Sequence, residues 1–245
     1  MPATPAWPPA STPRLFVDHA LAEGVRFALD GAQSNYLGNV MRLKAGDPVR
    51  LFDDRTGEWL ATVADVAKRA VTLAIEGRLR EREAVPDLWL LFAPIKKGRI
   101  DWLIEKATEL GVARLQPVIT RRTIVDRLNL ERLRAHAIEA AEQCDRTALP
   151  VLEEPMKLEA LLRGWDSGRA LIFADETGGA PLAQAAKAGP AAILIGPEGG
   201  FTADERVAIG AVAGAVPVSL GPRILRADTA AAAAIAVWMA TAGDW

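Results

Sequence analysis

Hydrophobic and polar residues alternate in short runs at the start of the chain. The strand-like runs cover residues 14–21, 25–29, 48–52, 58–66 and 70–75. Turn-forming residues separate them, including the DDRTG stretch before the fourth run. Residues 33–43 have the spacing of a short helix instead. Several short strands with turns between them predict a small β-barrel domain over residues 13–80, and the charged segment 77–87 predicts a linker.

The pattern changes at Leu88, where strands and helices begin to alternate. Apolar runs predict buried strands at residues 88–94, 113–119, 148–152, 169–174, 191–195 and 216–220. Helical spacing predicts a helix that ends at Gly111, a second over 129–144, and short helices after the last three strands. Such alternation is typical of a mostly parallel sheet covered on both faces. Residues 86–245 are therefore predicted to form an α/β domain.

Composition restricts the class of protein only slightly. The 245 residues are 50% hydrophobic and 24% charged, which is ordinary for a globular protein. The net charge of -2 gives no general attraction to nucleic acid, so an RNA site would depend on local basic clusters. The single cysteine, Cys144, excludes an internal disulfide, and we expect it to be a small buried residue.

The ends and apolar runs of the chain bear on its location. Residues 1–12 are rich in Pro and Ala and lack the basic start of a signal peptide, so they predict a disordered leader. No uninterrupted apolar run has the length of a membrane span. Together these features predict a cytoplasmic protein with no membrane partner.

The most informative stretch is 191–209, where an apolar strand runs into the sequence GPEGG and then into a helix. Thr202 and Glu205 have the spacing of a capping box, which marks the start of that helix. Glycines let backbone amides approach a ligand, and ligands of open α/β sheets bind where strands end. The loop lacks the motifs of a dinucleotide site and of a P-loop. A strand-to-helix turn without a ligand remains the alternative.

A second informative stretch covers residues 216–240. A strand ends in Leu-Gly, the sequence PRILR comes next, and a helix begins near Asp228 or Thr229, both of which are good N-caps. Two arginines directly before a helix N-terminus predict a site for anionic groups. The alanines 230–234 reflect high helix propensity, or they let a flat ligand or another backbone lie close to the helix.

Basic residues come directly after two of the predicted strands. The sequence PIKKGR covers residues 94–99, and a pair of arginines stands at 121–122. Strands of a parallel sheet end at one edge, so these side chains are expected together there, as phosphate contacts or as ordinary solvated loops. No His or Cys has the spacing of a metal ligand, so no metal site is predicted.

Six segments together resemble the bacterial 16S rRNA (uracil-N(3))-methyltransferase family of the SPOUT superfamily. They occur in the order of the family and are RLFVD (14–18), MRLKAGD (41–47), KKGRIDWLIEKATELGV (96–112), AIEAAEQCDR (137–146), LIGPEGGFTADE (194–205) and LGPRILRADTA (220–230). The combination of IGPEGGF with LGPRILR is far more specific than a single glycine-rich loop. The segments extend over nearly the whole chain after the leader.

The resemblance implies a fold, a cofactor and partners. The N-terminal domain would be a PUA-like β-barrel that helps to hold RNA, and the C-terminal domain a SPOUT α/β domain with a trefoil knot, although knots are rare. The protein would work as a homodimer, with S-adenosylmethionine as cofactor and 16S rRNA, within the small ribosomal subunit, as partner. The expected cofactor-binding residues are Leu194, Gly196, Pro197, Glu198, Gly199, Gly200, Leu220, Gly221, Ile224, Leu225, Arg226, Thr229 and Ala230. The expected RNA-binding residues are Arg14, Arg42, Lys96, Lys97, Arg99, Arg121, Arg122 and Arg223.

The implied reaction, methylation of the N(3) imide nitrogen of a uridine, suggests roles for three residues. The nitrogen must lose its proton, which Glu198 or Asp228 could accept. Arg226 could stabilise the charge that develops on a uracil carbonyl oxygen. The target base must also leave its stack to reach the pocket. The family usually has Glu where this chain has Asp228, and a KGD pattern where this chain has KKGR.

Three other functions remain open at this point. A SPOUT methyltransferase could act on another RNA, such as tRNA or 23S rRNA, and only the RNA substrate would distinguish it. A non-catalytic RNA-binding protein would fail to bind the cofactor. A nucleotide-dependent α/β enzyme would need the phosphate-binding motifs that this sequence lacks.

Overall fold

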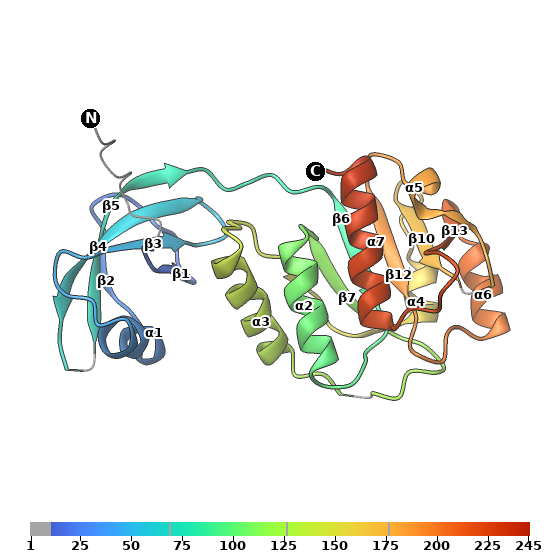
Figure 1. The fold of residues 1–245 in the computed structure, drawn as a ribbon, viewed down its shortest axis with the longest axis horizontal. Coiled ribbons are helices and arrows are strands. Elements are labelled where there is room, and N and C mark those ends of the chain that lie inside the picture. The colour runs from blue at the N-terminus through green and yellow to red at the C-terminus, as the bar shows by residue number, and fades with distance from the viewer. Residues whose placement is uncertain (1–10, 69, 126, 176) are drawn as a thin grey trace. The chain divides into compact units, whose positions relative to one another are not determined.

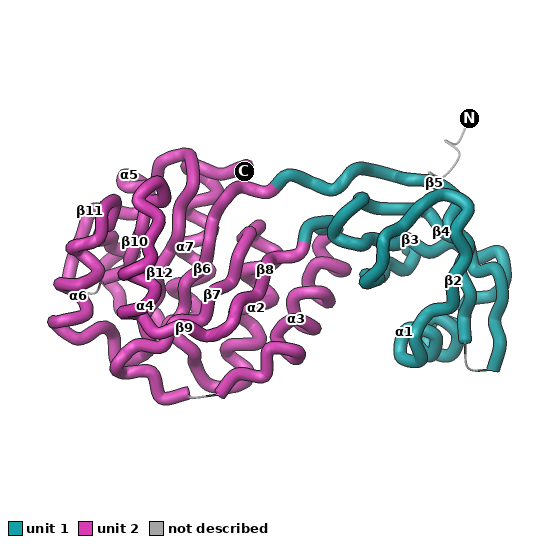
Figure 2. Tube along the Cα trace, turned by 180° about the vertical axis from the view of Figure 1, so that it is seen from behind, with its two compact units in different colours: residues 1–84, 145–148 teal, residues 85–144, 149–245 magenta. Residues whose placement is uncertain are grey.

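The computed structural model describes residues 11–68, 70–125, 127–175 and 177–245. The predicted disordered leader therefore lies outside the described residues except at its last two positions. The chain divides into two compact units, shown in Figure 2: unit 1 extends to Ala84 and includes Asp145–Ala148, and unit 2 contains Val85–Cys144 and Leu149–Trp245. The first boundary falls inside the segment that the sequence predicts as a linker.

Unit 1 is built on a five-stranded mixed sheet with the order β1-β3-β4-β5-β2. Its strands are β1 (Arg14–Phe16), β2 (Arg26–Ala28), β3 (Pro48–Phe52), β4 (Glu58–Val66) and β5 (Val71–Arg80). β1 runs parallel to β3, and the other neighbours are antiparallel. A short helix α1 (Gly31–Asn35) continues into a π-helical turn (Tyr36–Val40), where the sequence predicts one helix.

The predicted linker begins too early, because β5 extends to Arg80. Arg80 lies opposite Glu58 of β4, and its guanidinium Nε lies 2.9 Å from the Glu58 carboxylate. Charged residues at 77–87 look like a linker in the sequence, but the first of them are held in the sheet by a partner on the neighbouring strand.

A short segment from the second half of the chain, Asp145–Ala148, belongs to unit 1. The Arg14 guanidinium, whose side chain is only 3% exposed, pairs with Glu58 and donates to the Arg146 carbonyl at 2.8 Å. The Glu83 carboxylate accepts two backbone N–H groups of the segment, at 2.8 and 2.9 Å. The chain therefore returns to unit 1 through polar contacts, of which the one from Arg14 is buried.

Unit 2 contains an eight-stranded sheet with the order β11-β13-β10-β12-β6-β7-β8, and β9 pairs with β7 beside this path. All of the strand pairs in it are parallel among the described residues. Its strands are β6 (Leu88–Phe92), β7 (Arg114–Ile119), β8 (Val151–Leu152), β9 (Met156–Lys157), β10 (Ala170–Ala174), β11 (Ala180–Pro181), β12 (Ala191–Ile195) and β13 (Ala215–Ser219). Each strand expected from the apolar runs is present, although the one expected at 148–152 is reduced to Val151–Leu152, and the two-residue strands β9 and β11 are additional.

Helices cover both faces of this sheet (Figures 1 and 2). They are α2 (Arg99–Glu109), α3 (Leu130–Gln143), α4 (Leu158–Arg163), α5 (Leu182–Ala185), α6 (Ala203–Gly210) and α7 (Ala227–Ala242). Side chains alternate between the faces: Leu90 and Ile193 join the core under α2, α3 and α7, whereas Leu91 and Leu194 join the core under α4 and α6. Cys144, at the end of α3, is exposed, so the expectation that it is buried is wrong.

The strand order decides where the loops meet. β10 lies between β12 and β13, although β12 and β13 are successive strands in the chain. Because these strands are parallel, the loops at their carboxyl ends all leave the same edge of the sheet. The glycine-rich loop after β12 and the PRILR loop after β13 are thereby brought together beside the start of α7.

Candidate functional site

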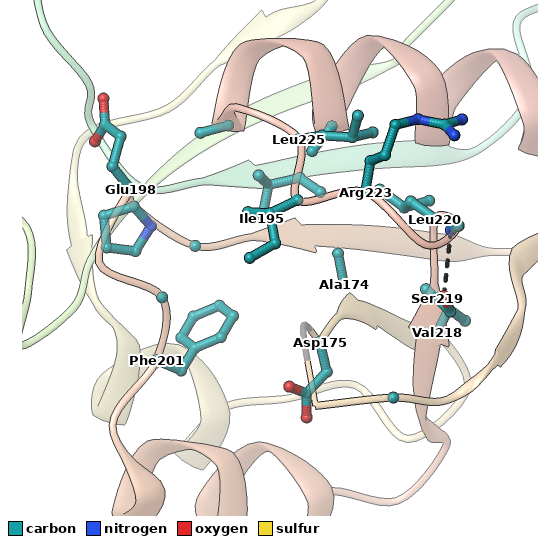
Figure 3. A pocket seen from close by; sticks show the side chains of 18 of the residues that line it. Ala174, Asp175, Ile195, Glu198, Phe201, Val218, Ser219, Leu220, Arg223 and Leu225 are labelled. Carbon is teal, nitrogen blue, oxygen red and sulfur yellow. Dashed lines mark hydrogen bonds between the residues drawn. The ribbon is translucent and has the colours of Figure 1, made fainter.

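A pocket of about 180 Å³ opens at this edge of the unit 2 sheet (Figure 3). Its walls come from the residues directly after β10, β12 and β13 and from the first turns of α7. The lining residues are Ala174, Asp175, Gly178, Ile195, Gly196, Pro197, Glu198, Gly200, Phe201, Val218, Ser219, Leu220, Gly221, Pro222, Arg223, Ile224, Leu225, Ala227 and Ala230.

The glycine-rich wall of the pocket is a tight turn. The Gly200 N–H donates to the Pro197 carbonyl at 2.8 Å, and Gly200 has a φ of 65°, which disfavours other residue types. The capping box expected for Thr202 and Glu205 is present and starts α6 directly after this turn. Phe201 is only 2% exposed and anchors the end of the turn in the core under α4 and α6.

The opposite wall is the loop between β13 and α7. Gly221 has a φ of 105°, and its N–H donates to the Ser219 hydroxyl at 3.2 Å. Ala227 and Ala230 are buried in the first turns of α7 and also line the pocket. Their small side chains allow the helix to lie close to a ligand in the pocket.

The pocket combines apolar and charged surfaces. Glu198 and Arg223 lie on opposite sides in Figure 3, with Ile195 and Leu225 between them. A second carboxylate, Asp175, is only 10% exposed, and Arg206 approaches it to 3.3 Å. Such a site suits a ligand with a flat apolar part and with groups of both charges.

Most of the residues expected at the cofactor lie at this pocket. Those that line it are Gly196, Pro197, Glu198, Gly200, Leu220, Gly221, Ile224, Leu225 and Ala230. Their binding roles stay predictions.

The remaining expected cofactor residues lie elsewhere. Leu194 is buried in the core under α4 and α6, and Gly199 faces Arg122. Arg226 and Thr229 stand at the start of α7, where the Thr229 N–H donates to the Asp228 carboxylate at 2.9 Å. None of these side chains is among the lining residues.

The expected RNA-binding residues have different surroundings. Lys96 and Lys97 are exposed between β6 and α2, and Arg99 is half-buried in the first turn of α2. Arg121 and Arg122 follow β7 after Thr120, and Arg223 is exposed after β13. These residues all lie beyond the carboxyl ends of parallel strands, as the sequence predicts.

In unit 1 the expected RNA-binding residues differ from each other. Arg42 is exposed, with a φ of 58°. Arg14 is buried, with its guanidinium 4.0 Å from the centre of the Phe52 ring and paired with Glu58. The surroundings of Arg14 indicate a structural role in the sheet, and the proposed RNA contacts of both residues stay predictions.

Sequence reasoning missed Asp175, Ser219 and Phe201 as lining residues. Asp175 comes directly after the apolar run of β10, and the rule that ligands bind where strands end would have found it. Ser219 stands at the carboxyl end of β13 in the same way. Phe201 carries no such signal, because an aromatic residue after a turn is more often part of a core.

Neither a membrane span nor a metal cluster is present within the described part of the chain. No helix there is both long and apolar enough to cross a membrane. No group of three or more His, Cys, Asp or Glu residues is arranged there to hold a metal ion.

The fold and the pocket together define the RNA methyltransferase class. The family model described as an RNA methyltransferase domain matches residues 81–239, and the model described as an RNA methyltransferase PUA domain matches residues 29–76. The expected fold class, a SPOUT-type α/β unit with a PUA-like unit before it, is confirmed.

Relatives identify the particular family. The ribosomal RNA small subunit methyltransferase E of Rickettsia conorii is 32% identical over 229 residues, with 91% of this chain and 93% of the relative covered. The protein of that name from Synechocystis is 33% identical, with 85% and 71% covered. This chain belongs to the ribosomal RNA small subunit methyltransferase E family.

Two solved structures support the same assignment. A methyltransferase from Legionella pneumophila, solved with S-adenosylmethionine, has a TM-score of 0.86 at 29% identity and covers 96% of this chain and 100% of its own. The ribosomal RNA small subunit methyltransferase E of Neisseria gonorrhoeae, also bound to S-adenosylmethionine, has a TM-score of 0.85 at 28% identity, with 96% and 99% covered.

Proposed function

We propose that this chain transfers the methyl group of S-adenosylmethionine to the N(3) nitrogen of a uridine in 16S rRNA. The observation that carries the proposal is the pocket formed by the IGPEGGF and LGPRILR loops. It occurs in a chain that matches two S-adenosylmethionine-bound relatives along 96% of its length.

The chemistry of the pocket fits this cofactor. The apolar side chains of Ile195, Val218 and Leu225 suit its adenine ring, and the glycine turns expose backbone N–H groups. Asp175 can accept hydrogen bonds from ribose hydroxyls or from the amino group. When bound, the cofactor supplies an electrophilic methyl group. The chain itself has to bind and orient both reactants.

The position of the basic residues supports RNA delivery to the same edge. Lys96 and Lys97 come after β6, and Arg223 comes after β13 at the pocket itself. Cations at these positions would bind phosphate groups on either side of an unstacked uridine. The PUA-like unit would add contacts to the same RNA.

Two acidic residues are candidates for removing the imide proton, and the structure favours Glu198. Glu198 lines the pocket and is exposed, whereas Asp228 does not line it and accepts the Thr229 N–H. Arg226 stands at the N-cap of α7, where helix N–H groups and a guanidinium both favour negative charge. It would stabilise the uracil oxygen as the proton leaves.

We further propose that the protein acts in the cytoplasm as a homodimer on the assembled small subunit. Large apolar side chains are exposed on unit 2, namely Trp102 at 40%, Ile124 at 85% and Ile224 at 91%, and their burial between two copies would favour self-association. Light scattering of the purified chain would test the homodimer: a monomeric mass at micromolar concentration would refute self-association.

The experiment that tests the function uses small ribosomal subunits from cells that lack this protein. They are incubated with the purified chain and methyl-labelled S-adenosylmethionine, and the rRNA is digested to nucleosides. We expect label in 3-methyluridine. Label in a different nucleoside or in a different RNA would refute the proposed specificity, and tRNA and 23S rRNA serve as the comparison substrates.

A further inference from the structure

The loop after β7 is cross-linked to the glycine-rich wall of the pocket. The Arg122 guanidinium donates to the Gly199 carbonyl at 2.5 Å. A Cβ added to Gly199 would lie 3.3 Å from Arg122 Cδ and 3.5 Å from Arg122 Cβ, so the stem of Arg122 covers this glycine. Gly199 does not line the pocket, yet both neighbours, Glu198 and Gly200, do. Arg122 therefore holds the outer side of a turn whose inner side faces the ligand.

A second cross-link joins the same two loops through Glu205. One carboxylate oxygen accepts the Thr202 N–H at 2.8 Å, as in any capping box. The other oxygen accepts the Arg121 N–H, from the loop after β7, at 2.7 Å. Glu205 is only 6% exposed, so its carboxylate is largely shielded from water. The carboxylate that caps α6 thus also fixes the end of the pocket loop to its neighbour.

The loop after β7 is itself a firm anchor. The Thr120 N–H donates to the Thr123 hydroxyl at 2.9 Å, and the Thr123 N–H donates to the Thr120 carbonyl at 3.2 Å. Thr120 is 6% exposed and comes directly after the buried strand β7. The turn that carries Arg121 and Arg122 is therefore closed independently of the pocket loop.

From this geometry we propose that Arg122 and Glu205 are positioning residues for the cofactor. They hold residues 197–201 in the shape that binds S-adenosylmethionine before the cofactor arrives, so that binding does not have to order the loop. The inference rests on the proposed function, and it assigns the Arg122 guanidinium to the cofactor loop instead of to a phosphate of the RNA.

Direct binding of S-adenosylmethionine to the full chain, measured by calorimetry without RNA, tests this role. Loss of a charge-assisted bond in R122A should raise Kd roughly 10-fold. E205Q should do the same, because an amide nitrogen would face one of two N–H donors. R122K keeps a donor and should recover part of the affinity.

Arg121 supplies the matched control. Its side chain is 60% exposed and reaches Glu159 at 3.9 Å, while its contribution to the cross-link is a backbone N–H that R121A retains. R121A should bind the cofactor as tightly as the wild type. In turnover, R122A should raise the KM for S-adenosylmethionine and leave the KM for ribosomal subunits unchanged.

Each possible result supports or overturns the inference. Equal Kd for R122A and wild type would overturn the inference, and a raised KM for subunits beside it would make Arg122 an RNA contact. An equal loss of cofactor affinity in R121A would also overturn it, because loop charge would then be the cause. Absence of cofactor binding by the wild type would overturn the proposed function together with this inference.

Discussion

Gly196 begins the turn after β12, and its replacement by Ala probes how tightly the pocket is packed. A Cβ at this position would lie 3.1 Å from two carbon atoms of the Phe201 ring. Carbon atoms in good contact are about 3.5–4.0 Å apart, so the ring would have to move by about 0.4 Å or more. Phe201 is 2% exposed and packed under α4 and α6, so it resists that movement.

Two opposing effects determine how much G196A changes the free energy of unfolding. Overpacking of a tight core costs about 1–3 kcal/mol, whereas Gly→Ala at a compatible backbone position gains about 0.4–1 kcal/mol through the unfolded chain. Gly196 is not among the glycines with positive φ, so the gain applies. We expect G196A to lower the free energy of unfolding by about 1–2 kcal/mol, because the steric cost is the larger. Since Phe201 lines the pocket, the Kd for S-adenosylmethionine should rise roughly 5- to 10-fold.

Chemical denaturation and calorimetry measure the two quantities on the same variants. Gly210, at the end of α6, is a matched control because a Cβ there would meet nothing within 4 Å. G210A should gain about 0.5 kcal/mol and bind the cofactor like the wild type. F201L should remove the clash with the new Cβ. The double variant G196A/F201L should therefore lose less unfolding free energy than the two single variants lose in total. Wild-type stability and affinity in G196A would refute this account of the pocket.

Three further variants test other contacts. R226A should lower turnover about 100-fold, because it removes the cation that stabilises charge on the uracil oxygen. The Kd for S-adenosylmethionine should not change, because Arg226 does not line the pocket. An unchanged single-turnover rate would show that Arg226 takes no part in the reaction. Arg169, whose side chain is 8% exposed, donates hydrogen bonds to two backbone carbonyls and to Asp87. R169M should therefore lower the free energy of unfolding by about 2 kcal/mol at pH 7, measured by urea unfolding. The Arg169 hydrogen bond holds the pKa of Asp87 below its ordinary value, so the pair stabilises the fold fully above about pH 4. The stabilisation by the Arg169–Asp87 pair is lost as pH falls through the lowered pKa of Asp87. If the difference in unfolding free energy between wild type and R169M did not shrink over that pH range, the role given to this pair would be wrong. E58Q should destabilise unit 1 by about 3 kcal/mol, because it removes the carboxylate that pairs with the buried charge of Arg14. A loss below about 1 kcal/mol would show that other groups balance the charge of Arg14.

Sequence pattern predicted the architecture of unit 2 well because its signals are local. The runs at 88–94 and 191–195 are apolar almost throughout, as expected for parallel strands buried on both faces, and both contain strands. The capping box at Thr202 and Glu205 depends on residues three positions apart and was equally visible. The two pocket loops could be found for the same reason, since each comes directly after such a strand.

Pairing between distant segments could not be predicted in this way. The segment 145–148 lies next to α3 in the chain, and nothing in its composition indicates that it packs in unit 1. Asp175 reaches the pocket because β10 lies between β12 and β13, and strand order is not encoded in the hydrophobic pattern. Periodicity assigns a residue to a face of an element but does not identify the element that covers that face.

Arg14 and Arg122 illustrate the consequence for function. Both are among the residues expected to bind RNA, because a cation near an RNA enzyme's site suggests a phosphate contact. In the structure each has a partner far away in the chain: Glu58 lies 44 positions from Arg14, and Gly199 lies 77 positions from Arg122. A guanidinium bound within the fold would have to give up that partner to reach RNA, and the buried Arg14 would have to leave the sheet core as well. Arg122, Lys96 and Lys97 are all exposed. Long-range partners of this kind cannot be predicted from the local pattern, so basic residues that the sequence treats alike differ in what they must give up to bind RNA.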